Sequence, residues 1–275
     1  MLTSTKSQVV PRPFLKWAGG KSRLIPQYSK YFPKQFTNYY EPFLGGGAVF
    51  FHLQPKSAFL TDINADLINT YCCVRDNVEE LITCLEKHES RHNKEYYYDV
   101  RSYPQGTEIE RAARLIYLNK TCFNGLYREN SKGEFNVPMG RYKNPGICNA
   151  DLLRSVSALL KSLTIENRHF EDVLKYANSA EDFVYFDPPY FPINDTSYFT
   201  SYSRDSFTKD DQIRLRDIFA ELASRNVKLL LSNSDCKFIR ELYSGFKINP
   251  ILAARAINSK AKLRGKVAEV LITSY

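Results

Sequence analysis

The chain has 275 residues, 43% of them hydrophobic, which is enough to bury a full core and excludes intrinsic disorder as the default expectation. Its formal charge of +8 and its 14% of aromatic residues are typical of a protein that binds a polyanion and stacks on its bases, although a merely basic protein is the alternative. The six cysteines form no C-x-x-C pair, residues 1–13 show no apolar signal region, and no run of about 18 apolar residues occurs; we therefore expect a cytoplasmic protein with no metal framework and no membrane span.

Strands and helices alternate in the first third of the chain. A strand leads through three glycines into a helix, a second strand ends in Asp62, and two helical patterns follow. The expected strands are 39–41 and 58–62, and the expected helices are 48–53, 64–74 and 78–85. This order predicts the start of a doubly wound α/β sheet.

The pattern changes between about residue 95 and about residue 178. Helical spacing at 109–118 and at 152–163 flanks a polar stretch, 130–146, that has no period. Long loops in compact domains are usually functional or disordered. The stretch contains the apolar anchors Phe135, Val137, Met139 and Tyr142. We therefore expect an insertion that is mostly helical and carries one ordered, functional loop.

Short apolar runs return after the insertion. The runs 183–186 and 227–232 have the length of buried strands, and 267–272 supplies a last strand near the C-terminus. The sequence therefore predicts a single sheet whose strands come from both sides of the insertion.

The glycine turn at residues 45–47 is a weak signal alone, because Phe50 stands where a dinucleotide-binding motif has its third glycine. An ordinary tight turn would look the same. Asp62 adds weight, since an acid at the end of the next strand is where nucleoside-binding sheets hold a ribose. The missing third glycine argues against NAD. Together with Asp62, the turn favours a nucleoside cofactor without pyrophosphate.

The segment 14–21 contains the only tryptophan, Trp17, with Lys16 and Lys21 around paired glycines. It is not a phosphate-binding loop, because Leu15 occupies the position of the required first glycine. A hydrophobic anchor is one interpretation. Alternatively, the indole face could attract a sulfonium, and Lys21 could pair with a carboxylate.

Residues 88–92 match the H-E-x-x-H pattern of zinc proteases. Arg91 places a cation between the two histidines, no third ligand is evident, and the flanking residues are charged. We therefore interpret this segment as a solvated charged face and not as a zinc site.

The strongest signal is Asp187-Pro188-Pro189-Tyr190, directly after the apolar run 183–186. Two prolines fix the backbone and bring no N–H, so we expect their carbonyls to be free to accept hydrogen bonds. Asp187 adds a charged acceptor and Tyr190 a flat ring. A turn after an edge strand is the alternative, but the residues suit a site that holds a planar, amino-bearing base at the carboxyl end of a sheet.

Taken together, these motifs resemble the Dam-type DNA adenine N6-methyltransferases, over nearly the whole chain and in the same order. The matching segments are 14–21, 41–47, 62–64, 119–142, 187–190 and 199–202. The resemblance implies a Rossmann-like, S-adenosylmethionine-dependent methyltransferase fold with an antiparallel final strand. It also implies that residues 1–94 and 179–275 form the catalytic domain and that 95–178 is an inserted target-recognition subdomain.

The resemblance assigns roles residue by residue. The catalytic residues would be Asp187, Pro188 and Tyr190. The cofactor, S-adenosyl-L-methionine, would be bound by Trp17, Lys21, Phe43, Gly45, Gly47, Asp62 and Asp187. The DNA-binding residues would be Lys16, Phe123, Asn124, Leu126, Arg128, Pro138 and Arg141.

The resemblance implies transfer of a methyl group to N6 of adenine in double-stranded DNA. It also implies GATC as the target, because residues 123–128 keep the pattern of the family members that recognise this site. The adenine would be flipped out of the duplex. Methylation of cytosine N4, of RNA adenine or of a protein glutamine remains an alternative, as does a non-catalytic DNA-binding protein. A restriction endonuclease encoded nearby is a candidate partner, and no stable protein partner is implied.

Overall fold

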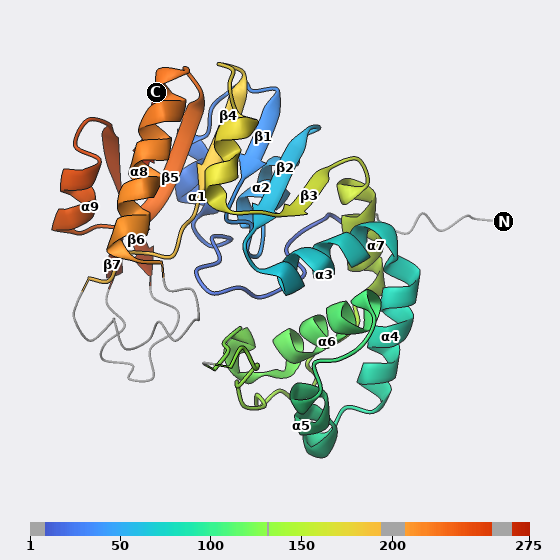
Figure 1. Ribbon diagram of the computed structural model, residues 1–275. Helices are drawn as coiled ribbons and strands as arrows, with labels where there is room; N and C mark the ends of the chain where they lie inside the picture. The colour runs from blue at the N-terminus through green and yellow to red at the C-terminus, as the bar shows by residue number, and fades with distance from the viewer. Residues whose placement is uncertain (1–8, 131, 194–206, 255–265) are drawn as a thin grey trace. The chain divides into compact units, whose positions relative to one another are not determined.

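The computed structural model of this protein describes residues 9–130, 132–193, 207–254 and 266–275 (Figure 1). The chain divides into two compact units. The first, here the helical unit, comprises Met1–Gly20, Gly45–Gln54 and Asn64–Ile165; the second, the sheet unit, comprises Lys21–Leu44, Pro55–Ile63 and Glu166–Tyr275. The matching segment 199–202 lies outside the described residues.

Within the described residues, the sheet has seven strands in the order β3-β2-β1-β4-β5-β7-β6. The pairs β2–β1, β1–β4 and β4–β5 are parallel, whereas β7 is antiparallel to both β5 and β6. The strands are β1 (Asn38–Glu41), β2 (Ala58–Asp62), β3 (Thr164–Asn167), β4 (Asp182–Phe186), β5 (Lys228–Ser234), β6 (Lys247–Ala254) and β7 (Lys266–Thr273). The predicted methyltransferase sheet with its antiparallel final strand is confirmed.

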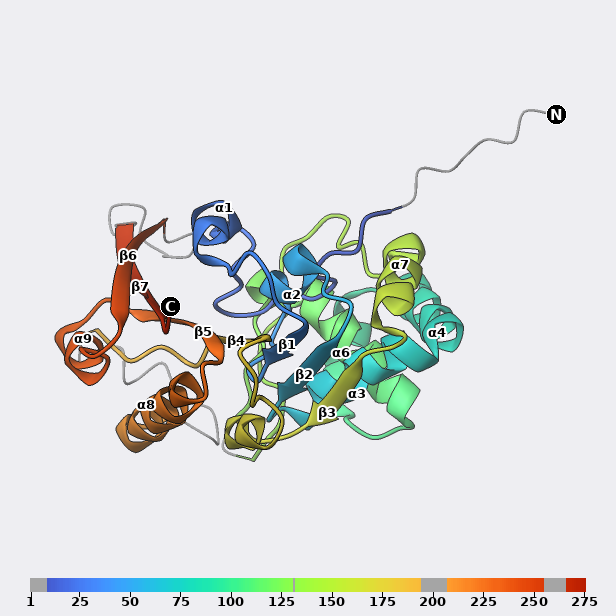
Figure 2. The ribbon, with the colours of Figure 1, turned by 90° about the horizontal axis from the view of Figure 1, so that it is seen from above.

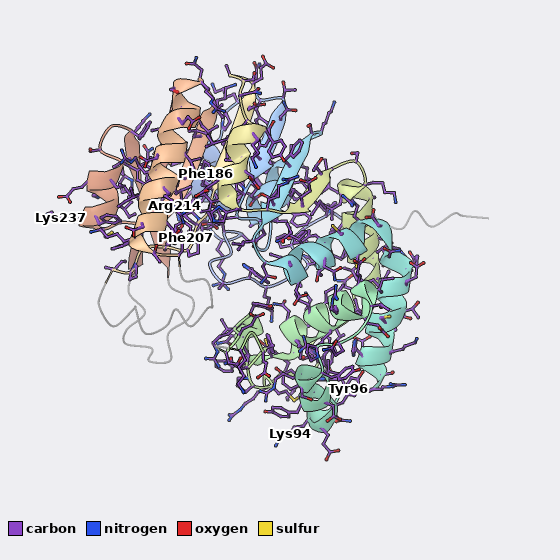
Figure 3. The ribbon with its side chains drawn as sticks, viewed as in Figure 1. Lys94, Tyr96, Phe186, Phe207, Arg214 and Lys237 are labelled. Carbon is purple, nitrogen blue, oxygen red and sulfur yellow. The ribbon has the colours of Figure 1, made fainter. Side chains whose placement is uncertain are left out.

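Burial explains why the central strands were recognisable. All five residues of β4 are buried, which is the pattern of a parallel strand covered on both faces. Behind it, a core of apolar side chains joins β4, β5 and β7 to α8 (Lys209–Ser224), whose place along the sheet is visible in Figure 2. Figure 3 contrasts Phe186, inside this core, with the exposed Lys237 at the start of α9 (Lys237–Leu242).

Strands β3 and β6 and helices α1 (Ile25–Tyr28), α8 and α9 were not predicted. Strand β6 contains Pro250, which lacks an N–H and weakens any strand pattern. The sheet order places β6 at the edge, where a proline is tolerated. The sheet unit also contains the short 3-10 turns Ser29–Tyr31 and Phe170–Lys175.

The helical unit is organised around α6, whose inner face is buried along its whole length. Its helices are α2 (Ala48–Leu53), α3 (Ala65–Asp76), α4 (Val78–Ser90), α5 (Lys94–Ser102), α6 (Glu108–Thr121) and α7 (Ala150–Leu160). Side chains cap four of them at the N-terminus, namely Asn64, Asn93, Thr107 and Asn149. The predicted helices at 48–53, 64–74, 78–85, 109–118 and 152–163 are therefore confirmed, with ends shifted by a few residues.

The compact helical unit is larger than the predicted insertion, because α3 and α4 also belong to it. The predicted insertion also contains β3, a strand of the sheet. The division into 95–178 and the rest followed the change of sequence pattern and the family resemblance, and it stays a prediction. Among the described residues, no helix is both long and apolar enough to cross a membrane.

Candidate active site

Asp187 follows the last residue of β4, and its two carboxylate oxygens have different surroundings. Oδ1 accepts hydrogen bonds from Lys21 Nζ at 2.9 Å and from Ser232 Oγ, on the neighbouring strand β5, at 2.7 Å. Oδ2 makes no hydrogen bond within the part of the chain that the structure describes. Lys21 is almost fully buried, whereas the Asp187 side chain is 19% exposed. The site therefore holds the carboxylate rigidly by one oxygen and leaves the other to accept.

The two proline carbonyls differ as well, which corrects the expectation that both are free. The Pro189 carbonyl accepts from Gln212 Nε2, on α8, at 2.9 Å. Gln212 Oε1 in turn accepts from Asn233 Nδ2 at 3.0 Å, and Asn233 Oδ1 accepts from the Phe191 N–H at 3.1 Å. Both amide side chains are buried. This closed ring of hydrogen bonds fixes the backbone of 189–191, and only the Pro188 carbonyl lacks a hydrogen bond among the described residues.

Tyr190 is held at both its hydroxyl and its ring. The hydroxyl donates to Glu269 Oε2, on β7, at 3.1 Å, and the buried Tyr28 donates to the same oxygen at 3.0 Å. Lys21 Nζ lies 4.6 Å from the centroid of the Tyr190 ring. Burial, and then the charge of Asp187, raise the pKa of Tyr190 well above its usual value, so the hydroxyl remains a donor at neutral pH. One face of the ring thus carries an ammonium group.

The carboxyl ends of three neighbouring parallel strands bring further predicted residues to the same edge of the sheet. Phe43 follows β1, Asp62 ends β2, and Asp187 follows β4. Phe43 stacks on Phe170 with centroids 5.3 Å apart. The backbone carbonyl of Asp62 accepts from Asn167 Nδ2 at 2.8 Å, which anchors the end of β2. This edge is where open α/β sheets bind ligands.

The glycine turn lies in the helical unit, immediately before α2. Gly45 and Gly47 have φ of +47° and +65°, a conformation that favours glycine. A Cβ on Gly45 would stand 2.7 Å from Cδ1 of Trp17, so the turn can approach the indole only without a side chain. The Gly45 carbonyl accepts from the hydroxyl of Tyr71 at 3.1 Å. Packing against Trp17, together with the backbone angle, explains the glycine.

Six of the seven predicted DNA-binding side chains are exposed, and Leu126 is half-buried; all belong to the helical unit. Phe123 is 50% exposed and stands at the start of a tight turn in which Asn124 and Gly125 have φ of +57° and +64°. Arg128 Nε donates to Asn136 Oδ1 at 2.6 Å, while its two terminal amino groups make no hydrogen bond among the described residues. A planar fork of donors is therefore displayed at a fixed place.

The remaining residues of this surface are tied to the same turn. The Pro138 carbonyl accepts from the Phe123 N–H at 2.9 Å, and Lys16 Nζ lies 4.6 Å from the centroid of the exposed Tyr142 ring. Arg141 is exposed. The structure thus gathers the turn 123–128, the segment around Pro138 and Lys16 within one unit.

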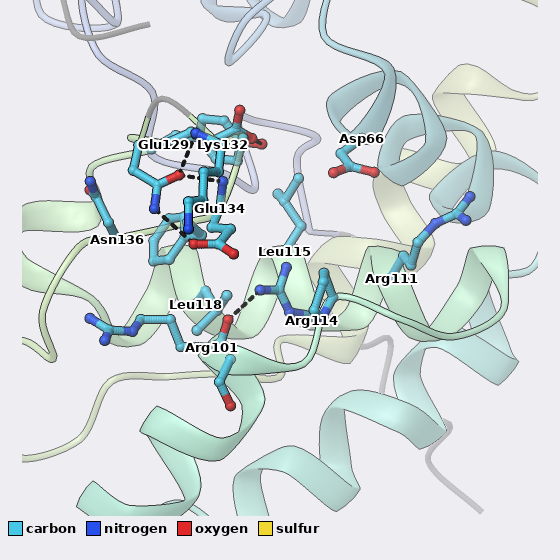
Figure 4. A pocket seen from close by; sticks show the side chains of 16 residues that line it. Asp66, Arg101, Arg111, Arg114, Leu115, Leu118, Glu129, Lys132, Glu134 and Asn136 are labelled. Carbon is cyan, nitrogen blue, oxygen red and sulfur yellow. Dashed lines mark hydrogen bonds between the residues drawn. The ribbon is translucent and has the colours of Figure 1, made fainter. Parts of the chain in front are cut away.

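A pocket of about 430 Å³ also lies in the helical unit (Figure 4). It is lined by Asp66, the end of α5, α6, and residues 127, 129, 130 and 132–136. One of its cations, Arg114, donates to the carbonyls of Val100 and Arg101 at 2.8 and 2.7 Å. None of the seven predicted DNA-binding side chains lines it, although Asn136, which accepts from Arg128, does.

The segment 88–92 is only in part the solvated face that the sequence suggested, because Glu89, Ser90 and Arg91 are exposed but the two histidines are half-buried. His88 stacks on Tyr117, with centroids 4.8 Å apart, and is hydrogen-bonded to the hydroxyl of Tyr96 at 2.8 Å. His92 lies beyond the end of α4 and is hydrogen-bonded to Tyr117 at 2.9 Å. Aromatic residues from α5 and α6 cover both rings, which a local charge pattern does not reveal.

Sequence reasoning missed the residues that hold the turn 187–190, namely Tyr28, Gln212, Ser232, Asn233 and Glu269. One signal was available, because Ser232-Asn233-Ser234 are polar residues at the end of a buried strand. Polar side chains in that position need partners. The other members come from elements with no recognisable motif.

Fold and site together define a class. A sheet in this order with an antiparallel final strand, an acid and a D-P-P-Y turn at its parallel strand ends, and a left-handed glycine turn are the features of an S-adenosylmethionine-dependent methyltransferase. A family model described as D12 class N6 adenine-specific DNA methyltransferase matches residues 17–257. The chain belongs to this family, and its methyl donor is S-adenosylmethionine.

Relatives from a bacterium and an archaeon match over almost their full length. The chain is 46% identical over 278 residues to the Type II methyltransferase M1.LlaDCHI of Lactococcus lactis subsp. cremoris, with 98% of each chain covered. It is 46% identical over 287 residues to the Type II methyltransferase M.MjaIII of Methanocaldococcus jannaschii, covering 96% of this chain and 99% of the relative. Identity to the DNA adenine methylase of Escherichia coli K12 is 36% over 264 residues, with 94% of each chain covered.

Proposed function

We propose that this protein methylates N6 of adenine within GATC in double-stranded DNA, and that the adenine is flipped out of the duplex to reach Asp187. The observation that supports this most directly is a pair of acceptors, Asp187 Oδ2 and the Pro188 carbonyl, to which none of the described residues donates a hydrogen bond, on a backbone held rigid by buried hydrogen bonds. An exocyclic amino group has two hydrogens, and this site offers one acceptor for each.

The residues present suit the cofactor. S-adenosylmethionine, when bound, supplies an electrophilic methyl group on a sulfonium. Gly45 and Gly47 provide a turn without side chains, and Asp62 is placed at the end of β2 to hold a ribose. One face of the Trp17 indole is stacked on Tyr127, and the other face can attract a cation. Phe43 and Lys21 complete the proposed set, with Lys21 acting through its ion pair to Asp187.

Asp187 and Pro188 act on the amino group. Each accepts one N6 hydrogen, which localises the nitrogen lone pair and directs it away from the ring. A hydrogen bond to a charged acceptor contributes about 1.5–3 kcal/mol. Lys21 and Ser232 keep the carboxylate from rotating. The nitrogen loses its proton after it has gained the methyl group, so no metal or covalent nucleophile is needed.

Tyr190 stabilises the flipped base. Because Lys21 occupies one face of its ring, the adenine stacks on the opposite face. Stacking contributes roughly 1–3 kcal/mol per base, against a flipping cost of a few kcal/mol. The exposed ring of Phe123 fills the gap left in the duplex. The fork of Arg128 reads a guanine, and Lys16, Asn124, Leu126, Pro138 and Arg141 complete the contacts to DNA.

The names of the two most similar relatives described above favour a restriction–modification setting. Both are Type II methyltransferases, whereas the Escherichia coli relative is a DNA adenine methylase. We therefore expect a restriction endonuclease of the same specificity to be encoded nearby, without a stable complex between the two proteins.

Methyl transfer from radiolabelled S-adenosylmethionine to paired duplexes tests the proposal. One duplex contains GATC and the other the same bases scrambled. We expect label only in the first, recovered as N6-methyladenine. In a separate binding experiment, 2-aminopurine replaces the target adenine, and its fluorescence should rise on binding because the flipped base leaves the stack. Equal labelling of both duplexes would contradict GATC recognition while leaving the chemistry intact.

The proposed contact of Arg128 with a guanine is tested separately. Arg128→Ala should lower the preference for GATC over scrambled DNA, because one bidentate contact contributes about 1–3 kcal/mol of discrimination. Arg141→Ala is the matched control and should weaken binding to both duplexes alike. An Arg128→Ala protein with an unchanged preference would rule out its role in base reading.

A further inference from the structure

Trp17 contacts two functional segments of the helical unit at once. The glycine turn packs so closely on Trp17 that a Cβ on Gly45 would be 2.7 Å from the indole ring, and one on Gly46 would be 3.3 Å from the Cβ of Trp17. The indole also stacks on Tyr127, with centroids 5.2 Å apart and planes 23° apart. Tyr127 belongs to the turn 123–128, here called the base-reading turn. Trp17 therefore contacts both the glycine turn and the base-reading turn.

A second connection runs through Asn119, which is buried in α6. Its side chain accepts from the Lys16 N–H at 2.9 Å and donates to the Lys16 carbonyl at 2.7 Å and the Gly125 carbonyl at 3.2 Å. Lys16 also passes so close to Gly125 that a Cβ there would stand 2.4 Å from its Cδ. Lys16, next to Trp17, and Gly125, in the turn of Tyr127, are thus connected by the hydrogen bonds of Asn119.

Tyr127 is itself held firmly. Its hydroxyl donates to Glu129, and its ring packs on the buried Phe135 with centroids 5.8 Å apart. Burial raises the pKa of Tyr127 far above its usual value, so the hydroxyl keeps its proton. A shift of the indole cannot leave Tyr127 in place without opening the stack, and a shift of the base-reading turn must move the surface that the indole lies on.

We infer that Tyr127 is a positioning residue that couples cofactor binding to DNA reading. The inference rests on the proposed contact between Trp17 and the cofactor. A cofactor bound against Trp17 favours the indole position that stacks on Tyr127, and that position favours the arrangement of the base-reading turn seen here. By linkage, GATC-containing DNA must tighten cofactor binding by the same factor by which the cofactor tightens DNA binding.

The single tryptophan makes the coupling measurable in the unmodified protein, because all indole emission comes from Trp17. The Kd of S-adenosylhomocysteine, a product that cannot react, is obtained from this emission with and without saturating GATC duplex. The Kd of a labelled GATC duplex is obtained by anisotropy with and without S-adenosylhomocysteine. For each ligand, the Kd without the other ligand is divided by the Kd with it. We expect these two ratios to be equal and to be about 5 or more, within the usual range for coupled sites.

Variants then locate the connection. Tyr127→Leu should bring both ratios to about 1, while Tyr127→Phe, which keeps the ring but loses the hydrogen bond to Glu129, should retain them. Tyr103→Leu is the matched control, since Tyr103 is 66% exposed and should leave the coupling unchanged. A merely structural role would weaken both affinities in Tyr127→Leu and leave their ratio as in the unmodified protein.

The outcomes separate this inference from the proposed function. If neither S-adenosylhomocysteine nor GATC duplex binds the unmodified protein, the proposed function fails. If both bind but each ratio is 1, the coupling is wrong and the function stands. A ratio that survives in Tyr127→Leu would overturn the role of Tyr127 in particular.

Discussion

The two oxygens of the Asp187 carboxylate have different roles in the proposed reaction. Oδ1 is held by an ammonium and a hydroxyl, and Oδ2 is left for the substrate. An acceptor that is already oriented does not have to be ordered when the reaction occurs, which is how rigid polar groups lower a barrier. The same division predicts that residues touching only Oδ1 affect the rate more than the affinity.

Ser232→Ala removes one of the two donors to Oδ1. We expect kcat to fall about 10- to 100-fold, the effect of one hydrogen bond to a charged group, with the Kd for GATC duplex nearly unchanged. Steady-state methylation and anisotropy give the two quantities. Ser224→Ala is the control, because Ser224 is exposed on α8 and, among the described residues, its Oγ bonds the carbonyl of Glu221 and no other group. A Ser232→Ala protein with normal kcat would show that Lys21 alone orients the carboxylate.

The hydrogen bond between Tyr190 and Glu269 can be tested by a double-mutant cycle. Glu269→Leu should lower kcat about tenfold, because the tyrosine ring loses the acceptor that orients it, whereas Glu269→Gln keeps an acceptor and should be mild. In a Tyr190→Phe background the effect of Glu269→Leu should shrink. Coupling energies of about 0.5–3 kcal/mol are usual for contacting residues. Additive effects would mean that Glu269 acts through Tyr28 instead.

At the scale of elements, the turn 187–190 is held by strands and a helix that are remote from it in sequence. Strand β5 contributes Ser232 and Asn233, α8 contributes Gln212, and β7 contributes Glu269. The glycine turn before α2 is constrained in a different way, by its own backbone angles and by the indole ring packed on it.

Gly45→Ala should therefore be costly and Gly245→Ala should not. At Gly45 a Cβ meets the indole at 2.7 Å and φ is +47°, while nothing lies within 4 Å of a Cβ at Gly245. We expect Gly45→Ala to lower stability by about 1–3 kcal/mol and to weaken binding of S-adenosylhomocysteine at least tenfold. Isothermal titration and chemical unfolding measure both. Equal behaviour of the two variants would show that the turn adapts.

For the whole molecule, stability in acid depends in part on histidines covered by aromatic rings. Burial, and then the charge of Arg91, lower the pKa of His88 to about 4. The unfolded chain, with a pKa near 6.5, binds this proton first. The contribution of the neutral ring is therefore fully present above about pH 6.5 and is lost as the pH falls toward 4.

The free energy of unfolding should fall less between pH 6.5 and pH 4 in His88→Asn than in the unmodified protein. The difference should be about 2 kcal/mol, allowing for the partial exposure of the ring. Unfolding in urea at a series of pH values measures this slope. His52→Asn is the control, since His52 is exposed on α2. A His88→Asn protein with the original slope would place the acid sensitivity elsewhere.

The sequence by itself determined the central strands, the family and the positions of the acids at the strand ends. Strands such as 183–186 are continuous apolar runs, and Asp62 and Asp187 follow such runs directly, so local pattern was sufficient. Only the tertiary structure decided what holds those acids. Lys21 and Ser232 meet Asp187 across 166 and 45 positions of the chain, and Trp17 meets Tyr127 across 110. Such contacts arise when the sheet and the helices pack, and a side chain that acts through a distant partner carries no periodic pattern in its own neighbourhood.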